Sequence, residues 1–211
     1  MNKADITRAV TLAVIRRLAQ NKEYYIPAAA SNRHIHISAA DREKLFGAEY
    51  ALKKLRPLSQ PGQYACEEQV TVAGPKGRIE GVRILGPERP ETQVEVSLTD
   101  TYRLGIEPAV RMSGDIAGTP GCTLTGPKGE VNIANGVIVA ARHLHMSGDE
   151  AAEYGLKDKD IVSAGKKGER EIIFGNILVR AGKGHSLELH IDTDEANAAG
   201  IKNGELLELL I

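Results

Sequence analysis

The chain has 211 residues, 42% of them hydrophobic, and its 27 basic and 28 acidic residues give a net charge of −1 with histidine neutral. This composition is typical of a globular protein that buries its core without disulfides. Nucleic acid is not the expected main partner, because a duplex-binding surface is usually strongly basic. The two cysteines are too few for a disulfide framework and favour a reducing, cytosol-like compartment. No membrane span or signal peptide is indicated, since the apolar run near the start is short and ends at Arg16 and Arg17.

An amphipathic helix is predicted over residues 3–20. Asn2 is its expected cap, and Asp5 lies in its first turn. The apolar residues that recur at helical spacing share one face: Ile6, Val10, Ala13, Val14 and Leu18. This face either packs on the rest of the chain or at a dimer interface, or it docks on a separate partner. Residues 21–31, with Pro27 and three alanines, are expected to form a connector.

The chain then repeats itself. Residues 33–38 read Arg-His-Ile-His-Ile-Ser, and residues 142–147 read Arg-His-Leu-His-Met-Ser. Gly-Pro-Lys-Gly occurs at 74–77 and again at 126–129, and a related Gly-Lys-Lys-Gly occurs at 165–168. Glycine supplies the positive φ angle of a tight turn, so these segments predict hairpins rather than phosphate-binding loops.

Strands and short helices are predicted along the whole chain. Alternating apolar and polar residues predict half-buried strands at 69–73, 94–98 and 187–191. Four short helices are each expected to start at an aspartate, or at the Ser or Thr before it, and to end at a glycine: Asp41 to Gly47, Asp100 to Gly105, Asp149 to Gly155 and Asp194 to Gly200. Aromatic residues are only 4%, and glycines number 22. Together these features predict a mainly β protein of two similar small barrels plugged by short helices. The spacings are too irregular for a solenoid.

The repeated segments carry the chemistry. Residues i and i+2 of a strand point to the same face, so His34 with His36, and His143 with His145, each present two imidazoles to one ion. The alternative is a polar stripe of strand histidines that bind neighbouring carbonyls. Two copies in a duplicated segment favour the metal interpretation.

Further donors are expected from two other strands. Glu95 is flanked by valines and completes a site unless it is an exposed strand glutamate. His190 has a similar strand setting, whereas His185 follows a Gly-Lys-Gly turn and is expected to face solvent. Cys66 and Cys122 are consistent either with ligands for a soft ion or with small core residues.

Arg89 lies between two prolines, where a fixed guanidinium suits phosphate recognition. A salt bridge to Glu88 or Glu91 is the alternative.

Four segments resemble the PduL-type phosphotransacylases, the phosphate propanoyltransferases: residues 31–38, 86–95, 116–121 and 141–147. The resemblance covers about residues 31–211. It implies two six-stranded β-barrels capped by short helices, in addition to the N-terminal amphipathic helix. Residues 1–22 would form that helix and a linker, residues 23–32 with 141–211 one barrel, and residues 33–140 the other, with the active site at their interface.

The resemblance also implies a site with two zinc ions, for which cobalt or nickel could substitute. His34 and His36 would bind one ion beside the sulfur of coenzyme A. The ligands implied for the other ion are Glu95, His143, His145 and His190. Arg89 matches the arginine that holds phosphate. The residues implied to line the coenzyme A site are Ser31, Arg83, Leu85, His190 and Asn197.

The implied reaction converts acyl-CoA, with a propanoyl or acetyl group, and phosphate into acyl phosphate and CoA. Direct transfer is expected, because neither Ser38 nor Ser147 has an evident partner base. Residues 3–20 resemble a peptide that directs such enzymes into a bacterial microcompartment, by contact with its shell or lumen proteins, as in propanediol degradation. Relatives without this peptide are cytoplasmic.

Two other classes of function remain open at this stage. A two-metal thioesterase or phosphoesterase would not need phosphate as a substrate, and a non-catalytic metal-binding protein would not bind CoA. The sequence also leaves the acyl preference, the native metal and the oligomeric state open.

Overall fold

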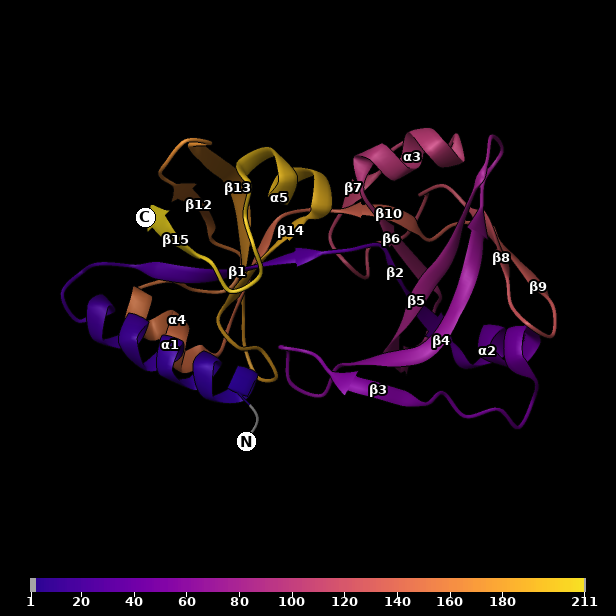
Figure 1. Cartoon of the computed structure of the whole chain (residues 1–211), viewed down its shortest axis with the longest axis horizontal. Helices are drawn as coiled ribbons and strands as arrows, with labels where there is room; N and C mark the ends of the chain where they lie inside the picture. Colours follow the sequence, from indigo (N-terminus) through magenta and orange to yellow (C-terminus); the bar gives the residue numbers. More distant parts are fainter. Residues whose placement is uncertain (1–2, 211) are drawn as a thin grey trace. The chain divides into compact units, whose positions relative to one another are not determined.

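The computed structural model describes residues 3–210. Asn2, the expected cap of the first helix, lies outside them. The chain divides into two compact units: the first comprises residues up to 31 together with residues from 142 onward, and the second comprises residues 32–141. Strands dominate both units (Figure 1), so the predicted mainly β fold with short helices is confirmed.

The first unit is a closed barrel of six strands. In order around the barrel these are β1 (Tyr25–Ser31), β14 (Glu188–Asp192), β11 (His143–Met146), β13 (Ile172–Ala181), β12 (Ile161–Lys166) and β15 (Leu206–Leu210). β15 pairs with the first half of β1 and closes the barrel. The prediction of a connector over 21–31 was therefore wrong from Tyr25 onward. Its three alanines show no alternation, and its pairing partners lie far along the chain.

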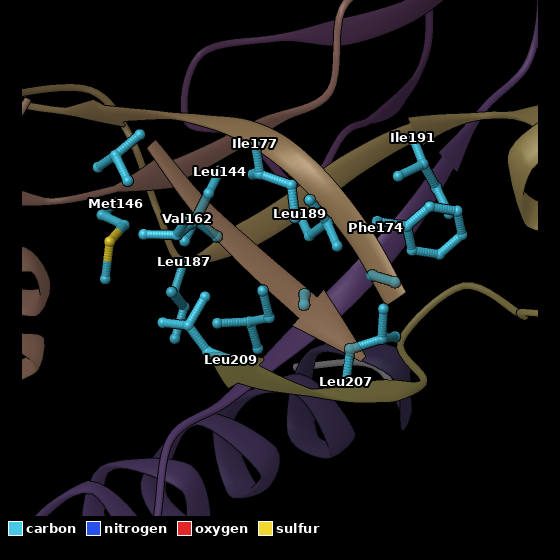
Figure 2. Close-up of a cluster of buried hydrophobic side chains, with 14 of the residues drawn as sticks. Leu144, Met146, Val162, Phe174, Ile177, Leu187, Leu189, Ile191, Leu207 and Leu209 are labelled. Carbon is cyan, nitrogen blue, oxygen red and sulfur yellow. The ribbon is translucent and has the colours of Figure 1, made fainter. Parts of the chain in front are cut away.

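Aliphatic side chains fill this barrel. Figure 2 shows Leu144, Val162, Ile177, Leu189 and Leu207, which come from different strands and are all buried in one cluster. They occupy inward positions of their strands, as the two-residue period of a strand requires. The helices α4 (Gly148–Tyr154) and α5 (Thr193–Ala199) each follow a strand that carries a candidate metal ligand.

The helix α1 (Lys3–Ala19) confirms the helix predicted over 3–20, and the apolar face named there is not the one that packs on the first unit. α1 packs against α4 and β1 through Ile15 and Ala19, with Leu12 partly buried. Ile6, Val10 and Val14 are 47%, 58% and 50% exposed. The helix has a second apolar stripe at i, i+3 and i+7, and that stripe is the one the barrel covers. Among the described residues, no helix is both long and apolar enough to cross a membrane.

The second unit is built on a sheet of nine strands, within the residues that the structure describes. Along the sheet these are β7 (Val110–Arg111), β10 (Val137–Ala140), β6 (Gln93–Val96), β2 (His34–Ser38), β5 (Arg78–Arg89), β4 (Tyr64–Ala73), β8 (Cys122–Thr125) and β9 (Glu130–Ile133), with β3 (Lys54–Pro57) paired to β4. The resemblance implies a six-stranded barrel here, whereas the described strands form a nine-stranded sheet whose order runs from β7 to β9. α2 (Ala39–Phe46) and α3 (Leu98–Leu104) follow β2 and β6.

The four short helices end at the predicted glycines, but each begins one or two residues before the predicted aspartate. Each begins after a capping residue whose side chain accepts a hydrogen bond from the helix's first turn: Ser38, Ser97, Ser147 and Asp192. Each ends at the expected glycine, and Gly105, Gly155 and Gly200 have left-handed backbones. Because each helix directly follows a strand, its cap also fixes the end of that strand.

The two Gly-Pro-Lys-Gly segments are hairpin turns, as predicted, and each contacts the end of a short helix. The amide of Lys76 donates to the carbonyl of Leu104 in α3, and the amide of Lys128 donates to the carbonyl of Leu45 in α2. A Cβ atom on Gly74 would collide with the backbone of Leu104. The glycine is therefore required by this close approach. The third segment differs, since its first two residues, Gly165 and Lys166, still belong to β12.

Candidate metal centres

The first cluster lies in the second unit and consists of His34, His36 and Glu95. β2 supplies both histidines, and the antiparallel register of β2 and β6 places His34 opposite Glu95. The Nε2 atom of His34 is 3.4 Å from one oxygen of Glu95, and the Nε2 atom of His36 is 3.7 Å from the other. All three residues are buried, and their donor atoms lie within 4.8 Å of one another.

The electrostatics of this cluster suit a cation. Burial lowers the pKa of His36 to about 3, and the charge of His34 acts in the same direction. Burial alone would raise the pKa of Glu95, but the charge and hydrogen bond of His34 hold it well below its usual value. For His34, burial would lower the pKa, but Glu95 raises it. The site therefore holds an ionised carboxylate beside at least one neutral imidazole.

Neighbouring polar side chains orient the first cluster. Gln93 donates to Glu95 over 2.6 Å, and the hydroxyl of Ser113 donates to the same carboxylate oxygen over 2.8 Å. Nδ1 of His34 lies 2.8 Å from the carbonyl of Asn32, which leaves Nε2 to face Glu95. Such outer contacts fix the tautomer and orientation of metal ligands.

Arg89 lies beside this cluster. Its guanidinium donates to Ser113 over 3.0 Å, and Ser113 in turn donates to Glu95. Arg89 and His36 both line a pocket with a volume of about 230 Å³, together with segments around Gly62 and Gly86. Glu88, one of the two carboxylates considered as a partner for Arg89, pairs with Arg42 instead over 2.7 Å.

The second cluster lies in the first unit and consists of His143, His145 and His190. β11 supplies the first two, and the antiparallel register of β11 and β14 places His143 opposite His190. The donor atoms again lie within 4.8 Å of one another. Burial lowers the pKa of His145 to about 2, and the charges of His143 and His190 act in the same direction. His145 is therefore neutral and able to act as a ligand.

His185 is a further member of this neighbourhood and corrects a prediction. Its ring centroid lies 4.5 Å from that of His145, and its side chain is half-buried rather than turned to solvent. The loop between β13 and β14 brings it there, and loop geometry of this kind has no periodic signal.

The six candidate ligands thus form two sets of three, each within one unit. The resemblance placed Glu95 with His143, His145 and His190, whereas the register of β2 and β6 places it beside His34 and His36. Sequence reasoning missed Gln93 and Glu188. Each precedes a candidate ligand by two residues on the same strand, so the two-residue period was the signal that could have found them.

The residues implied for coenzyme A are divided between the units. Ser31 ends β1 and Asn197 lies in α5 of the first unit, whereas Arg83 and Leu85 lie on β5, opposite His34 and His36 in register. The guanidinium of Arg83 donates to the carbonyl of Cys66 over 2.6 Å.

The cysteines behave as core residues. Cys66 and Cys122 are buried in the core of the second unit, and neither belongs to a donor cluster among the described residues. Burial raises the pKa of the Cys66 thiol to about 11 and that of the Cys122 thiol to about 12. Because neither lies in a group of donors within the described part of the chain, we do not expect either thiol to be a metal ligand.

The fold and the two clusters define a mainly β protein whose strands carry grouped, buried histidines. The profile of the family described as phosphate propanoyltransferase matches residues 27–202. The chain belongs to this family, and it is an enzyme of the transferase class.

Three relatives, each named phosphate propanoyltransferase, illustrate the similarity. The protein of Thermotoga maritima is 52% identical over 90% of both chains. That of Escherichia fergusonii is 50% identical over 94% of this chain and 95% of its own. That of Enterococcus faecalis is 45% identical over 97% of both chains.

Proposed function

We propose that this chain catalyses the metal-dependent conversion of acyl-CoA and phosphate into acyl phosphate and CoA. Propanoyl-CoA is the expected substrate, since the relatives are named for propanoyl transfer, and acetyl-CoA differs from it by only one methylene. The observation that carries the metal dependence is the paired His-x-His, because each pair acquires a third donor from a neighbouring strand.

The donor sets fit divalent zinc. Each has three protein ligands of the kinds that zinc accepts, and catalytic zinc sites typically keep a further position for substrate or water. The Nε2 atoms of His34 and His36 both face the carboxylate of Glu95, so an ion between them would meet two imidazole nitrogens and a carboxylate oxygen. Cobalt and nickel also accept imidazole and carboxylate ligands.

The chemistry requires a phosphate oxygen to attack the thioester carbonyl carbon, after which the C–S bond breaks and CoA leaves as the thiolate. A bound zinc ion would supply Lewis-acid stabilisation of that thiolate. Arg89 would hold the phosphate, because its guanidinium lines the pocket beside His36 and is braced by Ser113. Glu95 keeps its negative charge beside this arginine and is held in place by Gln93.

Direct transfer between the two substrates agrees with the roles of the serines. Ser38 and Ser147 both cap helices, and the hydroxyl of Ser38 donates to Asp41 over 3.0 Å. A serine nucleophile needs a base that accepts its proton. Asp41 already accepts from Thr92 and Lys44, and Glu150, beside Ser147, already accepts from the amides of Ser147 and Leu187. Coenzyme A would contact Ser31, Arg83, Leu85, His190 and Asn197.

α1 would also contact a partner in a bacterial microcompartment. One face of α1 packs on the first unit, and the exposed stripe of Ile6, Val10 and Val14 is available to a shell or lumen protein. Replacing these three residues with glutamine should leave activity intact and abolish co-assembly. Retained co-assembly would contradict this role.

The experiment for the reaction follows the release of free CoA thiol from propanoyl-CoA. The purified protein is assayed with and without phosphate, before and after chelation, and after zinc is restored. Release that requires both phosphate and metal supports the transferase. Release without phosphate would identify a thioesterase, and no release from metal-replete protein would contradict both enzymatic functions for this substrate.

Metal stoichiometry tests the two ion sites separately. The wild-type protein is expected to bind two zinc ions per chain, and His36→Ala and His145→Ala should each bind one. A wild-type stoichiometry of one, or an unchanged stoichiometry in either variant, would contradict two independent sites.

A further inference from the structure

Arg8, on the N-terminal helix α1, contacts Glu188 beside the second cluster. We infer that Arg8 is a positioning residue for His190 and acts through Glu188, so that α1 helps to set the metal affinity of this cluster. The inference rests on the ion site proposed for His143, His145 and His190.

The contacts form a continuous chain. Nη1 of Arg8 lies 3.0 Å from one oxygen of Glu188, and the other oxygen of Glu188 lies 2.8 Å from Nε2 of His190. Nη2 of Arg8 also donates to the hydroxyl of Ser186 over 3.2 Å. Thus the guanidinium contacts both β14 and the loop that precedes it.

Arg8 is placed by the packing of α1. It precedes Leu12, Ile15 and Ala19 on the helix face that the barrel covers. Its side chain is 31% exposed, whereas that of Glu188 is only 6% exposed. A buried carboxylate is costly without charged or polar partners, and Arg8 is one such partner of Glu188.

Glu188 lies beside the cluster as an outer contact. It precedes His190 by two residues on β14, so both side chains share one face of the strand. It is not one of the three residues whose donor atoms lie within 4.8 Å of one another. Its contact with His190 instead matches the carboxylate-histidine pairs that orient metal-bound imidazoles.

This contact determines the tautomer of His190. The carboxylate of Glu188 accepts a hydrogen bond from Nε2 of His190. Nε2 therefore carries the ring proton, and Nδ1 is the nitrogen left for an ion. Without Arg8, the carboxylate of Glu188 loses a contact that holds it beside His190, and the imidazole of His190 is less firmly oriented. α1 is therefore part of the construction of the site and not merely an appended segment.

The first test measures zinc affinity by competition with a chromophoric chelator. Arg8→Ala and Glu188→Gln should each lower the zinc affinity of one of the two sites by about 10- to 100-fold and leave the affinity of the other site unchanged. Arg16→Ala is the matched control, because Arg16 lies on the same helix and pairs with buried Glu150 over 3.5 Å, outside the cluster. Arg8→Lys should restore part of the affinity. Equal zinc affinities in Arg8→Ala, Arg16→Ala and wild type would overturn the inference.

The second test needs no metal. Long-range proton–nitrogen NMR spectra of the metal-free protein above pH 7.5 should place the proton of His190 on Nε2 in wild type and in Arg16→Ala. In Arg8→Ala and Glu188→Gln the two tautomers should mix. A single unchanged tautomer in those two variants would overturn the inference.

The two tests also separate the role of Arg8 from the ion site on which it rests. If the wild-type protein bound no ion at this cluster, the proposed ion site would fail too. If the wild-type protein bound the ion normally and the variants were unaffected, only the role of Arg8 would be contradicted.

Discussion

Arg33 donates from Nε to an oxygen of Asp100 over 2.8 Å, and this contact ties the start of β2 to the first turn of α3. The second copy of the repeat preserves the relationship, since Arg142 pairs with Glu195 in the first turn of α5. Both carboxylates also accept from the backbone of a capping residue. In each unit, the arginine before His-x-His thus fixes the histidine strand to a helix cap.

Asp100→Asn should lower the free energy of unfolding by about 1–3 kcal/mol, because it leaves the guanidinium of Arg33 without its buried carboxylate. Urea unfolding at neutral pH measures this change. Glu80→Gln is the control, since Glu80 pairs with Arg78 at a position where both side chains are about two-thirds exposed or more. Its effect should stay within about 0.5 kcal/mol. Equal stabilities of the two variants would contradict a structural role for the Arg33–Asp100 pair.

Gly74→Ala and Gly126→Ala should each destabilise the protein by about 1–3 kcal/mol, since an added methyl group collides with the backbone of Leu104 or Leu45. Gly148→Ala is the matched control. Gly148 is the first residue of α4, has no heavy atom near the added methyl group, and does not have a positive φ angle. Thermal unfolding should show lower midpoints for the first two variants and an unchanged or higher midpoint for the third. An unchanged midpoint for Gly74→Ala would show that the turn can move away from the helix.

The sequence predicted features that depend on local patterns. The glycines that end the four short helices, the two Gly-Pro-Lys-Gly hairpins and the His-x-His strands were found because a few adjacent residues define each of them. The helix starts were placed too late, because the capping residues lie two or three positions before the aspartates that were taken as the starts. β1 was missed because its strand pairing depends on β14 and β15. The sequence left open what the apolar face of α1 contacts, because the helix carries two apolar stripes and only the barrel determines which one is covered. The position of Glu95 beside His34 could not be predicted, because it depends on the register between β2 and β6, and no local pattern indicates that register.

The two thiols should be unreactive in the folded protein. Burial raises the pKa of Cys66 to about 11 and that of Cys122 to about 12, so at pH 8 both remain protonated as well as covered. A chromogenic disulfide reagent should label neither thiol in native protein and both in urea. The raised pKa favours the folded state below pH 9, and this contribution is lost as the pH rises from 9 toward 11 or 12. Rapid labelling of native protein at pH 8 would contradict the burial of these thiols. It would also complicate assays that detect CoA thiol.

Arg89→Lys should raise the KM for phosphate by about tenfold, or about 1.4 kcal/mol, because lysine cannot offer the two parallel donors of a guanidinium. The KM for propanoyl-CoA should change little. Ser113→Ala should produce a smaller increase in the KM for phosphate, since Ser113 braces Arg89 over 3.0 Å and leaves the guanidinium itself in the pocket. Initial rates measured over a grid of both substrates separate the two constants. If both KM values rose together, Arg89 would act on the whole site and not on phosphate alone.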